Sequence, residues 1–481
     1  MTASVSSAAD LSMTDLLAGY RSGALSPVQA TQEALDRAER LNQQVNAYCL
    51  LDPAGALDSA RESERRWRRG EPVGALDGVP FSIKDLLYTV GWPTLRGSHT
   101  IDKAGPWPED APSVARVREQ GAVLLGKTTT PELGWKGVTD SPLTGVTGNP
   151  WRPELTSGGS SGGSAVAVAL GMGAGSLGTD GGGSVRIPAA FCGIVGHKPT
   201  YARVPLYPAS PFGTLSHVGP MTRTAADAAL LLDVISAPDH RDPWALAPPT
   251  RSCVDALGSA VRDLAGLSIA VSPNLGYVSV HPEVATAFSA AVAVFEQLGA
   301  ALETVDPGFA DPIEAFHVLW FAGAAKSVAQ LDEAGRARLD PGLAEAVAAG
   351  RRFSAADYLG AMGVRNDLGI RMGAFHRRHP LLLTPTLPIP AFPGGLEVPA
   401  SGWTPGPGAD ARRWTSWTPF TYPFNMTQQP AASVPCGFTS DGLPIGLQIV
   451  GPRHADAAVL AAAHAFQQAT DWHLRRPPLL G

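Results

Sequence analysis

The chain has 481 residues, of which 44% are hydrophobic and 17% charged, an ordinary composition for a globular protein with a large core. Its net charge of −6 does not provide the basic surface that nucleic acids or anionic membranes attract, so we expect neither as a partner. The N-terminus lacks a basic segment followed by an apolar one, and no apolar run reaches about 18 residues. We therefore expect neither a signal peptide nor a transmembrane helix.

Short apolar runs alternate with helical patterns along the chain. Ser26 and Pro27 predict the start of a helix that extends to about Leu41, because serine caps a first turn and proline fits its first position. The segment 164–170 is too short for its apolar pattern to distinguish helix from strand. We predict helices at 282–298 and 455–468, and strands at 78–83, 122–127, 267–272, 301–305, 381–386 and 446–451. This alternation predicts an α/β fold.

Residues 392–424 are rich in proline, glycine and tryptophan, which predicts a long loop of the kind that is usually functional. His376 and His379 have a spacing that metal ligands can adopt, but their basic surroundings are typical of a solvated helix face, so we predict no metal. The chain has four cysteines that lie far apart and form no C-x-x-C pair: Cys49, Cys192, Cys253 and Cys436. We interpret them as buried free thiols in a reducing cytoplasm.

Lysine is scarce in this chain, which has 31 arginines but only six lysines. Arginine stays protonated in proteins, whereas a buried lysine can lose its proton, so a retained lysine is a candidate for acid–base chemistry. Lys84 is such a candidate because it directly follows the predicted strand 78–83. The lysines that no pattern singles out are expected at the surface.

Residues 155–188 contain eleven glycines and six serines. A flexible linker would be polar throughout, but this segment contains AVAVAL and continues into apolar residues. A phosphate-binding G-x-G-x-x-G loop at Gly173–Gly178 needs a helix next, whereas TDGGGS and then Pro188 follow. A G-x-S-x-G nucleophile elbow at Gly158–Gly162 needs a strand before it, whereas NPWRPELTS precedes it.

We favour an interpretation in which two serines serve hydrolysis, Ser160 and Ser184. Ser184 follows the three glycines 181–183, whose successive N–H groups can converge on an oxyanion. A serine needs a base, and Lys84 can act as one because burial lowers the pKa of a lysine. Ser160 can pass the proton between them. This set predicts hydrolysis of an amide.

The segment 158–200 closely resembles the amidase signature family, as do GVPFSIKD around Lys84 and the segments 126–151, 196–205 and 424–451. The resemblance covers about residues 10–470 and is weakest at 310–425. It implies a three-layer α/β/α fold with a central mixed β-sheet and a single domain spanning residues 1–481. Within it we expect N-terminal helices at about 10–60, a signature core at about 75–235 and a variable substrate-facing region at about 310–425.

The resemblance also implies roles for individual residues. Ser184 would be the nucleophile, Ser160 a relay on a cis peptide and Lys84 the base. The oxyanion hole would consist of the backbone N–H groups of Gly181, Gly182, Gly183 and Ser184. We expect Asp180 and Arg186 to form a buried pair that braces this loop, and Lys198 to support the structure. Gly134 matches a substrate-contacting position, and Leu133 and Trp135 flank it.

The least similar region is rich in aromatic residues, of which we expect at least two to line an apolar pocket. Phe316, Trp320 and Phe321 lie on an expected helix, and the late loop contains Trp403, Trp414, Trp417, Phe420, Tyr422 and Phe424. We assign Phe316 and Trp320 to the substrate pocket. Together these features predict an amidohydrolase for aryl or alkyl amides, with carbamates and esters as secondary substrates. We expect a monomer or homodimer that needs no cofactor. The alternative is the glutaminase subunit of a tRNA-dependent amidotransferase complex.

Overall fold

The computed structural model describes residues 7–260, 264–400 and 413–481. Within these ranges, eleven strands form one mixed sheet in the order β1-β3-β2-β6-β8-β7-β12-β13-β11-β9-β10. The strands of this sheet are β1 (Tyr48–Leu51), β2 (Pro80–Lys84), β3 (Val123–Thr128), β6 (Gly175–Asp180), β7 (Val195–Lys198), β8 (His217–Thr222), β9 (Ser268–Val271), β10 (Ala301–Thr304), β11 (Leu381–Pro385), β12 (Ala431–Phe438) and β13 (Pro444–Val450). A small hairpin of β4 (Asp140–Ser141) and β5 (Gly145–Val146) lies apart from it.

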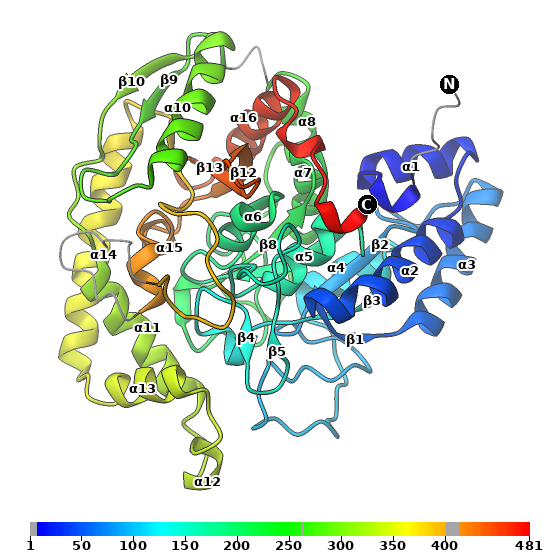
Figure 1. Ribbon diagram of the computed structural model, residues 1–481, viewed down its shortest axis with the longest axis horizontal. Coiled ribbons are helices and arrows are strands. Elements are labelled where there is room, and N and C mark those ends of the chain that lie inside the picture. Colours follow the sequence, from blue (N-terminus) through cyan, green and yellow to red (C-terminus); the bar gives the residue numbers. More distant parts are fainter. Residues whose placement is uncertain (1–6, 261–263, 401–412) are drawn as a thin grey trace.

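Helices pack on both faces of the sheet (Figure 1). They are α1 (Met13–Ser22), α2 (Pro27–Val45), α3 (Pro53–Arg69), α4 (Pro112–Glu119), α5 (Gly162–Ala169), α6 (Arg186–Cys192), α7 (Ala225–Ile235), α8 (Cys253–Leu257), α10 (Pro282–Gln297), α11 (Ile313–Ser327), α12 (Glu333–Arg336), α13 (Pro341–Gly350), α14 (Ala355–His376), α15 (Tyr422–Met426) and α16 (Asp456–Gln468). The predicted three-layer arrangement around a mixed sheet is confirmed.

Strand β3 illustrates how the layers form. Successive side chains of a strand point to opposite faces, and here Leu124 joins the core beneath α1, α7 and α16, whereas Val123 and Leu125 join the core beneath α2, α5 and α6. β2 pairs in parallel with both β3 and β6, while β6 pairs antiparallel with β8. Because β2 and β6 run in the same direction, their carboxyl ends meet at one edge of the sheet, where Lys84 and Asp180 lie.

The predicted helix after Ser26 is α2, and the Ser26 side chain accepts a hydrogen bond from the Gln29 N–H (3.1 Å). The strands and helices predicted from apolar runs are also present, with ends shifted by at most two residues. The undecided segment 164–170 lies mostly in α5, where every residue is buried. A helix that is buried all round has no amphipathic pattern, which is why the sequence did not reveal it.

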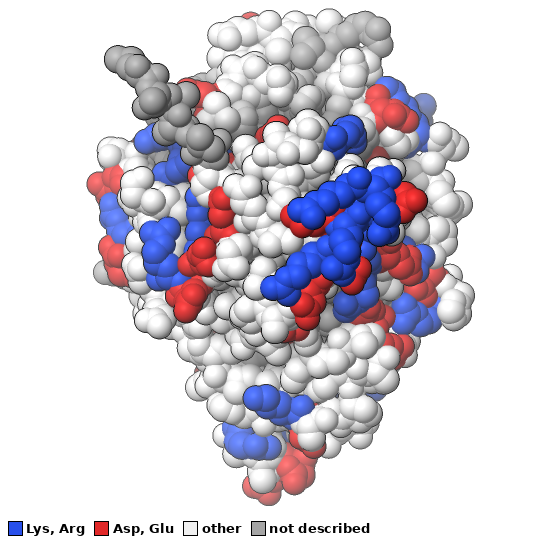
Figure 2. Space-filling model, turned by 90° about the vertical axis from the view of Figure 1, so that its right-hand side faces the viewer, with Lys and Arg blue, Asp and Glu red and all other residues white. Residues whose placement is uncertain are grey.

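The surface that carries α1–α3 mixes the two signs of charge (Figure 2). On α3, Arg61 pairs with Asp58 and Arg68 with Glu64. Within the described part of the chain, no helix combines the length and apolarity needed to cross a membrane. All four cysteines are free thiols; three are buried as expected, but Cys49 is exposed on β1.

Candidate active site

The structure brings the three predicted catalytic side chains together. Lys84 is the last residue of β2, Ser160 precedes α5, and Ser184 lies between β6 and α6. Ser160 and Ser184 both line one cavity of about 640 Å³, and Lys84 is buried beneath it with none of its surface exposed. The peptide bond between Gly159 and Ser160 is cis. Segments separated by up to 100 residues thus meet at one end of the parallel strands.

The side-chain nitrogen of Lys84 is surrounded by hydroxyl groups. Its Nζ lies 2.7 Å from Ser160 Oγ, 2.8 Å from Ser161 Oγ and 2.8 Å from Thr179 Oγ1. Burial lowers the pKa of Lys84 well below its ordinary value of 10.5, and the nearby Asp180 carboxylate only partly opposes this. Because no carboxylate is hydrogen-bonded to Nζ among these contacts, the environment favours the neutral amine.

One of these hydroxyl groups has a defined direction. Ser161 Oγ donates to the Thr179 carbonyl (3.1 Å), so its oxygen accepts from Lys84. A neutral amine has two N–H donors and one lone pair. Because one N–H of a neutral Lys84 donates to Ser161, its other N–H and its lone pair are left for Thr179 and Ser160.

The glycine loop 181–183 is held by Asp180. Its carboxylate accepts hydrogen bonds from the Gly183 N–H (2.8 Å) and the Val185 N–H (3.2 Å). This differs from the expectation for Gly183, because an N–H that is already bonded to a carboxylate is not available to an oxyanion. The candidate oxyanion donors that remain are the N–H groups of Gly181, Gly182 and Ser184.

Aromatic rings explain why these positions are glycine. A Cβ at Gly181 would lie 2.8 Å from the Trp320 ring, and one at Gly182 would lie 2.7 Å from Trp414 and 2.9 Å from Phe316. The rings also pack on each other, with Phe316 stacked on Trp320 at 5.4 Å between centroids. The loop is therefore pressed against an aromatic cluster that comes from α11 and from the segment 414–417.

Asp180 and Arg186 form the predicted buried pair. Arg186 Nε and Nη2 each donate a hydrogen bond of 3.0 Å to the Asp180 carboxylate, and neither side chain is exposed. Burial alone raises the pKa of Asp180, but the Arg186 guanidinium outweighs it and holds this pKa below the usual range. Arg186 also donates to Asn425 Oδ1 (2.7 Å) and Gln448 Oε1 (2.8 Å), so it connects the loop to the C-terminal part of the sheet.

Replacing Arg186 by methionine is expected to lower the free energy of unfolding by about 3–5 kcal/mol, because Asp180 would stay buried without its partner. Urea denaturation measures this change. Arg65→Met is the matched control, since Arg65 pairs with Glu62 on the exposed side of α3 and its loss should cost less than about 1 kcal/mol. Equal effects of the two substitutions would contradict the assigned brace.

Among the residues predicted to contact substrate, Leu133, Gly134 and Trp320 line the cavity. Trp135 and Phe316 are instead fully buried in the neighbouring core. Trp135 contributes through its backbone, since its carbonyl accepts a hydrogen bond from Trp320 Nε1 (2.9 Å) and so fixes that ring.

We expected at least two of the aromatic residues in the variable region to line the pocket, and the described ones supply one of them. Among those described, Trp320 lines the pocket, whereas the others pack in the aromatic core behind it: Phe316, Phe321, Trp414, Trp417, Phe420, Tyr422 and Phe424. Trp403 lies outside the described residues. These aromatic side chains occupy the space behind the glycine loop, which its glycines leave free because they have no side chains.

Sequence reasoning missed much of the cavity wall. The segment 206–212, LYPASPF, forms one side, and Phe212 stacks on Trp320 with their centroids 4.0 Å apart. Its two prolines and two aromatic residues are the signal that marks an ordered loop there. Arg96 and Lys326 also line the cavity.

Some basic residues lie elsewhere than expected. Lys136 is buried and pairs with Asp140 and Asp340, and Lys127 is buried 3.4 Å from Asp85. His376 and His379 are buried rather than solvated, and His376 Nδ1 donates to the His379 carbonyl (2.8 Å). In the described ranges, no group of three or more His, Cys, Asp or Glu side chains is arranged to hold a metal.

Comparison with known proteins agrees with this geometry. The Amidase family model matches residues 29–460. An acylamidase of Rhodococcus erythropolis is 39% identical, covering 97% of each chain. A glutamyl-tRNA(Gln) amidotransferase subunit of Geobacter sp. (strain M21) is 34% identical, covering 98% of this chain and 99% of the relative.

A solved structure is similar over nearly the whole chain. It is a bacterial aryl acylamidase of the amidase signature enzymes, with a TM-score of 0.87 and 31% identity over 96% of this chain and 97% of the other. The chain therefore belongs to the amidase family, which confirms the predicted fold and the predicted hydrolysis of linear amide bonds.

Proposed function

We propose that the chain hydrolyses aryl or alkyl amides through an acyl-enzyme on Ser184. The observation that carries this proposal is the buried Lys84, whose Nζ lies 2.7 Å from Ser160 beside the cavity that Ser184 enters. A buried lysine with hydroxyl partners and a lowered pKa is suited to accept a proton.

In the first half of the reaction, Ser184 Oγ attacks the amide carbon and passes its proton to Ser160, whose own proton moves to Lys84. The carbonyl oxygen becomes an oxyanion, and the N–H groups of Gly181, Gly182 and Ser184 stabilise it. When the C–N bond breaks, the proton returns through Ser160 to the leaving nitrogen. Water then attacks the ester carbon in the same way, which releases the acid and restores Ser184.

The substrate class follows from the cavity wall. Leucine, proline and aromatic side chains form its apolar part, including Leu86, Leu133, Leu206, Pro208, Phe212 and Trp320. Burial of apolar substrate surface against such a wall contributes about 25 cal/mol per Å². We therefore expect aryl and alkyl amides as the main substrates and carbamates or esters as secondary ones. We expect a cytoplasmic enzyme that works without a partner protein.

Glutamine hydrolysis within an amidotransferase is the second candidate, because several relatives are subunits of that enzyme. Free glutamine carries an ammonium group, which needs an acidic partner when it is buried. Among the described residues that line the cavity, none is Asp or Glu. This favours the amidase proposal over the glutaminase alternative.

A substrate panel tests this choice. The purified chain is assayed alone with acetanilide, 4-nitroacetanilide, hexanamide, a phenyl carbamate and glutamine. We expect turnover of the anilides and hexanamide and little ammonia from glutamine. Efficient release of ammonia from glutamine, with no turnover of anilides, would replace the proposal by the amidotransferase function.

Trp320 provides a matched variant for the same panel. Trp320→Leu keeps an apolar side chain but removes ring surface from the cavity wall, so we expect KM for 4-nitroacetanilide to rise more than KM for acetamide. Phe420→Leu, in the core behind the wall, serves as the control for general effects of losing an aromatic ring.

A further inference from the structure

The cavity that contains Ser160 and Ser184 has an unbalanced charge. Two cationic side chains line it, Arg96 and Lys326, and no Asp or Glu does so among the described residues. Neither cation forms a salt bridge with any part of the chain that the structure describes. Arg96 instead lies over the Tyr88 ring, with its guanidinium carbon 5.4 Å from the ring centroid.

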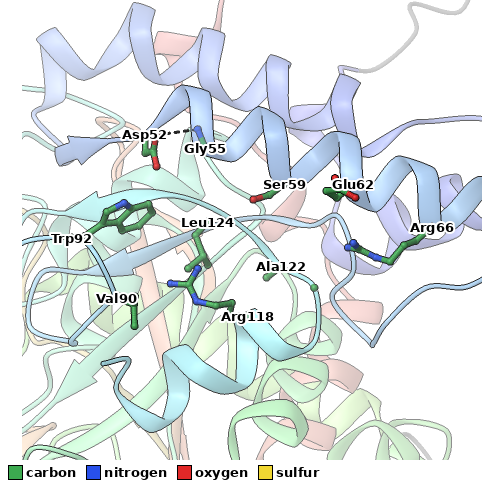
Figure 3. A pocket seen from close by; sticks show the side chains of 11 residues that line it. Asp52, Gly55, Ser59, Glu62, Arg66, Val90, Trp92, Arg118, Ala122 and Leu124 are labelled. Atoms are coloured by element: carbon green, nitrogen blue, oxygen red, sulfur yellow. Dashed lines mark hydrogen bonds between the residues drawn. The ribbon is translucent and has the colours of Figure 1, made fainter. Parts of the chain in front are cut away.

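In a second hollow, between α3, α4 and β3, the cationic side chains are paired with carboxylates (Figure 3). Its two arginines, Arg66 and Arg118, are each paired with a carboxylate, at 2.9 Å from Asp77 and 2.8 Å from Asp110. Acidic residues line that hollow as well. Arg96 and Lys326 differ from these two arginines because no carboxylate lines their cavity among the described residues.

Arg96 is also held in position by its backbone. It has φ of +54°, a left-handed conformation that a non-glycine residue adopts at some cost. The Leu133 N–H donates to the Arg96 carbonyl (2.7 Å), and the buried Asp85 accepts from the backbone at 96 and 97. Asp85 is fixed in turn by Lys127, 3.4 Å away. The fold thus fixes the place where the Arg96 side chain leaves the wall.

Lys326 enters the cavity from another side. It lies in the last turn of α11, six residues after Trp320, and Ser327 and Gln330 line the cavity beside it. Its side chain is exposed, so it is at the mouth rather than beneath the serines. An apolar wall that also carries the half-buried Arg96 and the exposed Lys326 is complementary to a molecule with an apolar part and an anionic group.

We propose that the enzyme prefers amides that carry a carboxylate separated from the scissile bond by an apolar spacer, with Arg96 and Lys326 binding the carboxylate. This inference rests on the proposed amidase function and narrows its substrates. The carboxylate can belong to the acyl part, as in a monoamide of a dicarboxylic acid, or to the amine part, as in an acylated aminobenzoate.

The test compares matched substrates with purified full-length enzyme. Monoanilides of succinic, glutaric and adipic acids carry the carboxylate on the acyl side, and butyranilide, valeranilide and hexananilide are their neutral partners. N-hexanoyl-4-aminobenzoate carries it on the amine side. We expect kcat/KM to be about tenfold higher for the best anionic substrate than for its neutral partner, as for a charge-assisted hydrogen bond, and this ratio to fall with added salt.

Three variants locate the effect. Lys326→Met and Arg96→Met should each lower the anionic-to-neutral ratio by about three- to tenfold, and Lys326→Glu should bring it below one. Lys103→Met removes an exposed lysine outside the cavity wall and should leave the ratio unchanged.

The possible outcomes separate the two proposals. A ratio near one in the unmodified enzyme, or the same ratio in both methionine variants as in the unmodified enzyme, overturns the carboxylate preference while the amidase function stands. If neither the anilides nor hexanamide is hydrolysed, the proposed function itself fails. The substrate series with the larger anionic-to-neutral ratio of kcat/KM shows whether the preferred carboxylate lies on the acyl or the amine side of the amide.

Discussion

Ser184→Ala is expected to lower kcat for an anilide by about 10⁵- to 10⁶-fold, because no other group in the proposed mechanism can form the acyl-enzyme. The fold should persist, since the substitution removes one oxygen at the cavity surface. A phosphonofluoridate label, located by mass spectrometry after digestion, should be found on Ser184 in the unmodified enzyme. The Ser184→Ala variant should take up no label.

Ser160→Ala is the informative companion to this variant. It should also be nearly inactive, because the proton path to Lys84 is interrupted, but its Ser184 should still react slowly with the label. A label found on Ser160 in the unmodified enzyme would contradict the assignment and restore the nucleophile-elbow interpretation of Gly158–Gly162.

Lys84→Arg should inactivate the enzyme nearly as completely as Lys84→Met, although it keeps a basic side chain. A guanidinium stays protonated and cannot accept the proton of Ser160, whereas the buried Lys84 can be neutral. Steady-state kinetics and single-turnover assays of both variants measure the effect. Substantial activity of Lys84→Arg would show that the position needs only charge and that the base lies elsewhere.

The pH dependence follows from the same residue. Since burial lowers the pKa of Lys84, kcat/KM should rise with pH through that lowered pKa as the neutral amine forms. Between the folded-state pKa and 10.5, the unfolded chain binds a proton at Lys84 that the folded chain does not. The contribution of Lys84 to the free energy of unfolding therefore increases with pH in this window, and Lys84→Met should remove that increase.

Local sequence patterns predicted the residues that lie at the ends of strands. Lys84 follows a short apolar run, and Ser184 follows three glycines, so both positions can be inferred without knowledge of distant contacts. Strands such as β2, β3 and β11 are buried on both sides and are therefore visible as apolar runs, whereas β6, with the sequence GSLGTD, has no such run and was not predicted. The closeness of these residues in space depended on the resemblance of the whole segment to a family.

Distant contacts account for what the sequence did not predict. Phe316 and Trp414 are aromatic residues near the pocket, but whether a ring faces the cavity or the glycine loop depends on backbone positions hundreds of residues apart. The Gly183 N–H is diverted by a carboxylate only three residues away, yet that contact depends on the loop conformation. The positive φ of Arg96 likewise results from hydrogen bonds to Asp85 and Leu133, which the sequence does not reveal.

The position of the last two strands has a consequence for how the protein is made. β12 and β13 lie in the middle of the sheet, between β7 and β11, and Gln448 on β13 binds Arg186 beside the nucleophile. A ribosome must therefore finish nearly the whole chain before the sheet can close and the glycine loop can be fixed. Before these two strands are made, the nascent chain exposes unpaired edges of β7 and β11 and has no completed active site. The enzyme therefore becomes active only when the last part of the chain has been translated. Truncation that removes β12 and β13 should abolish activity although Ser160 and Ser184 are retained.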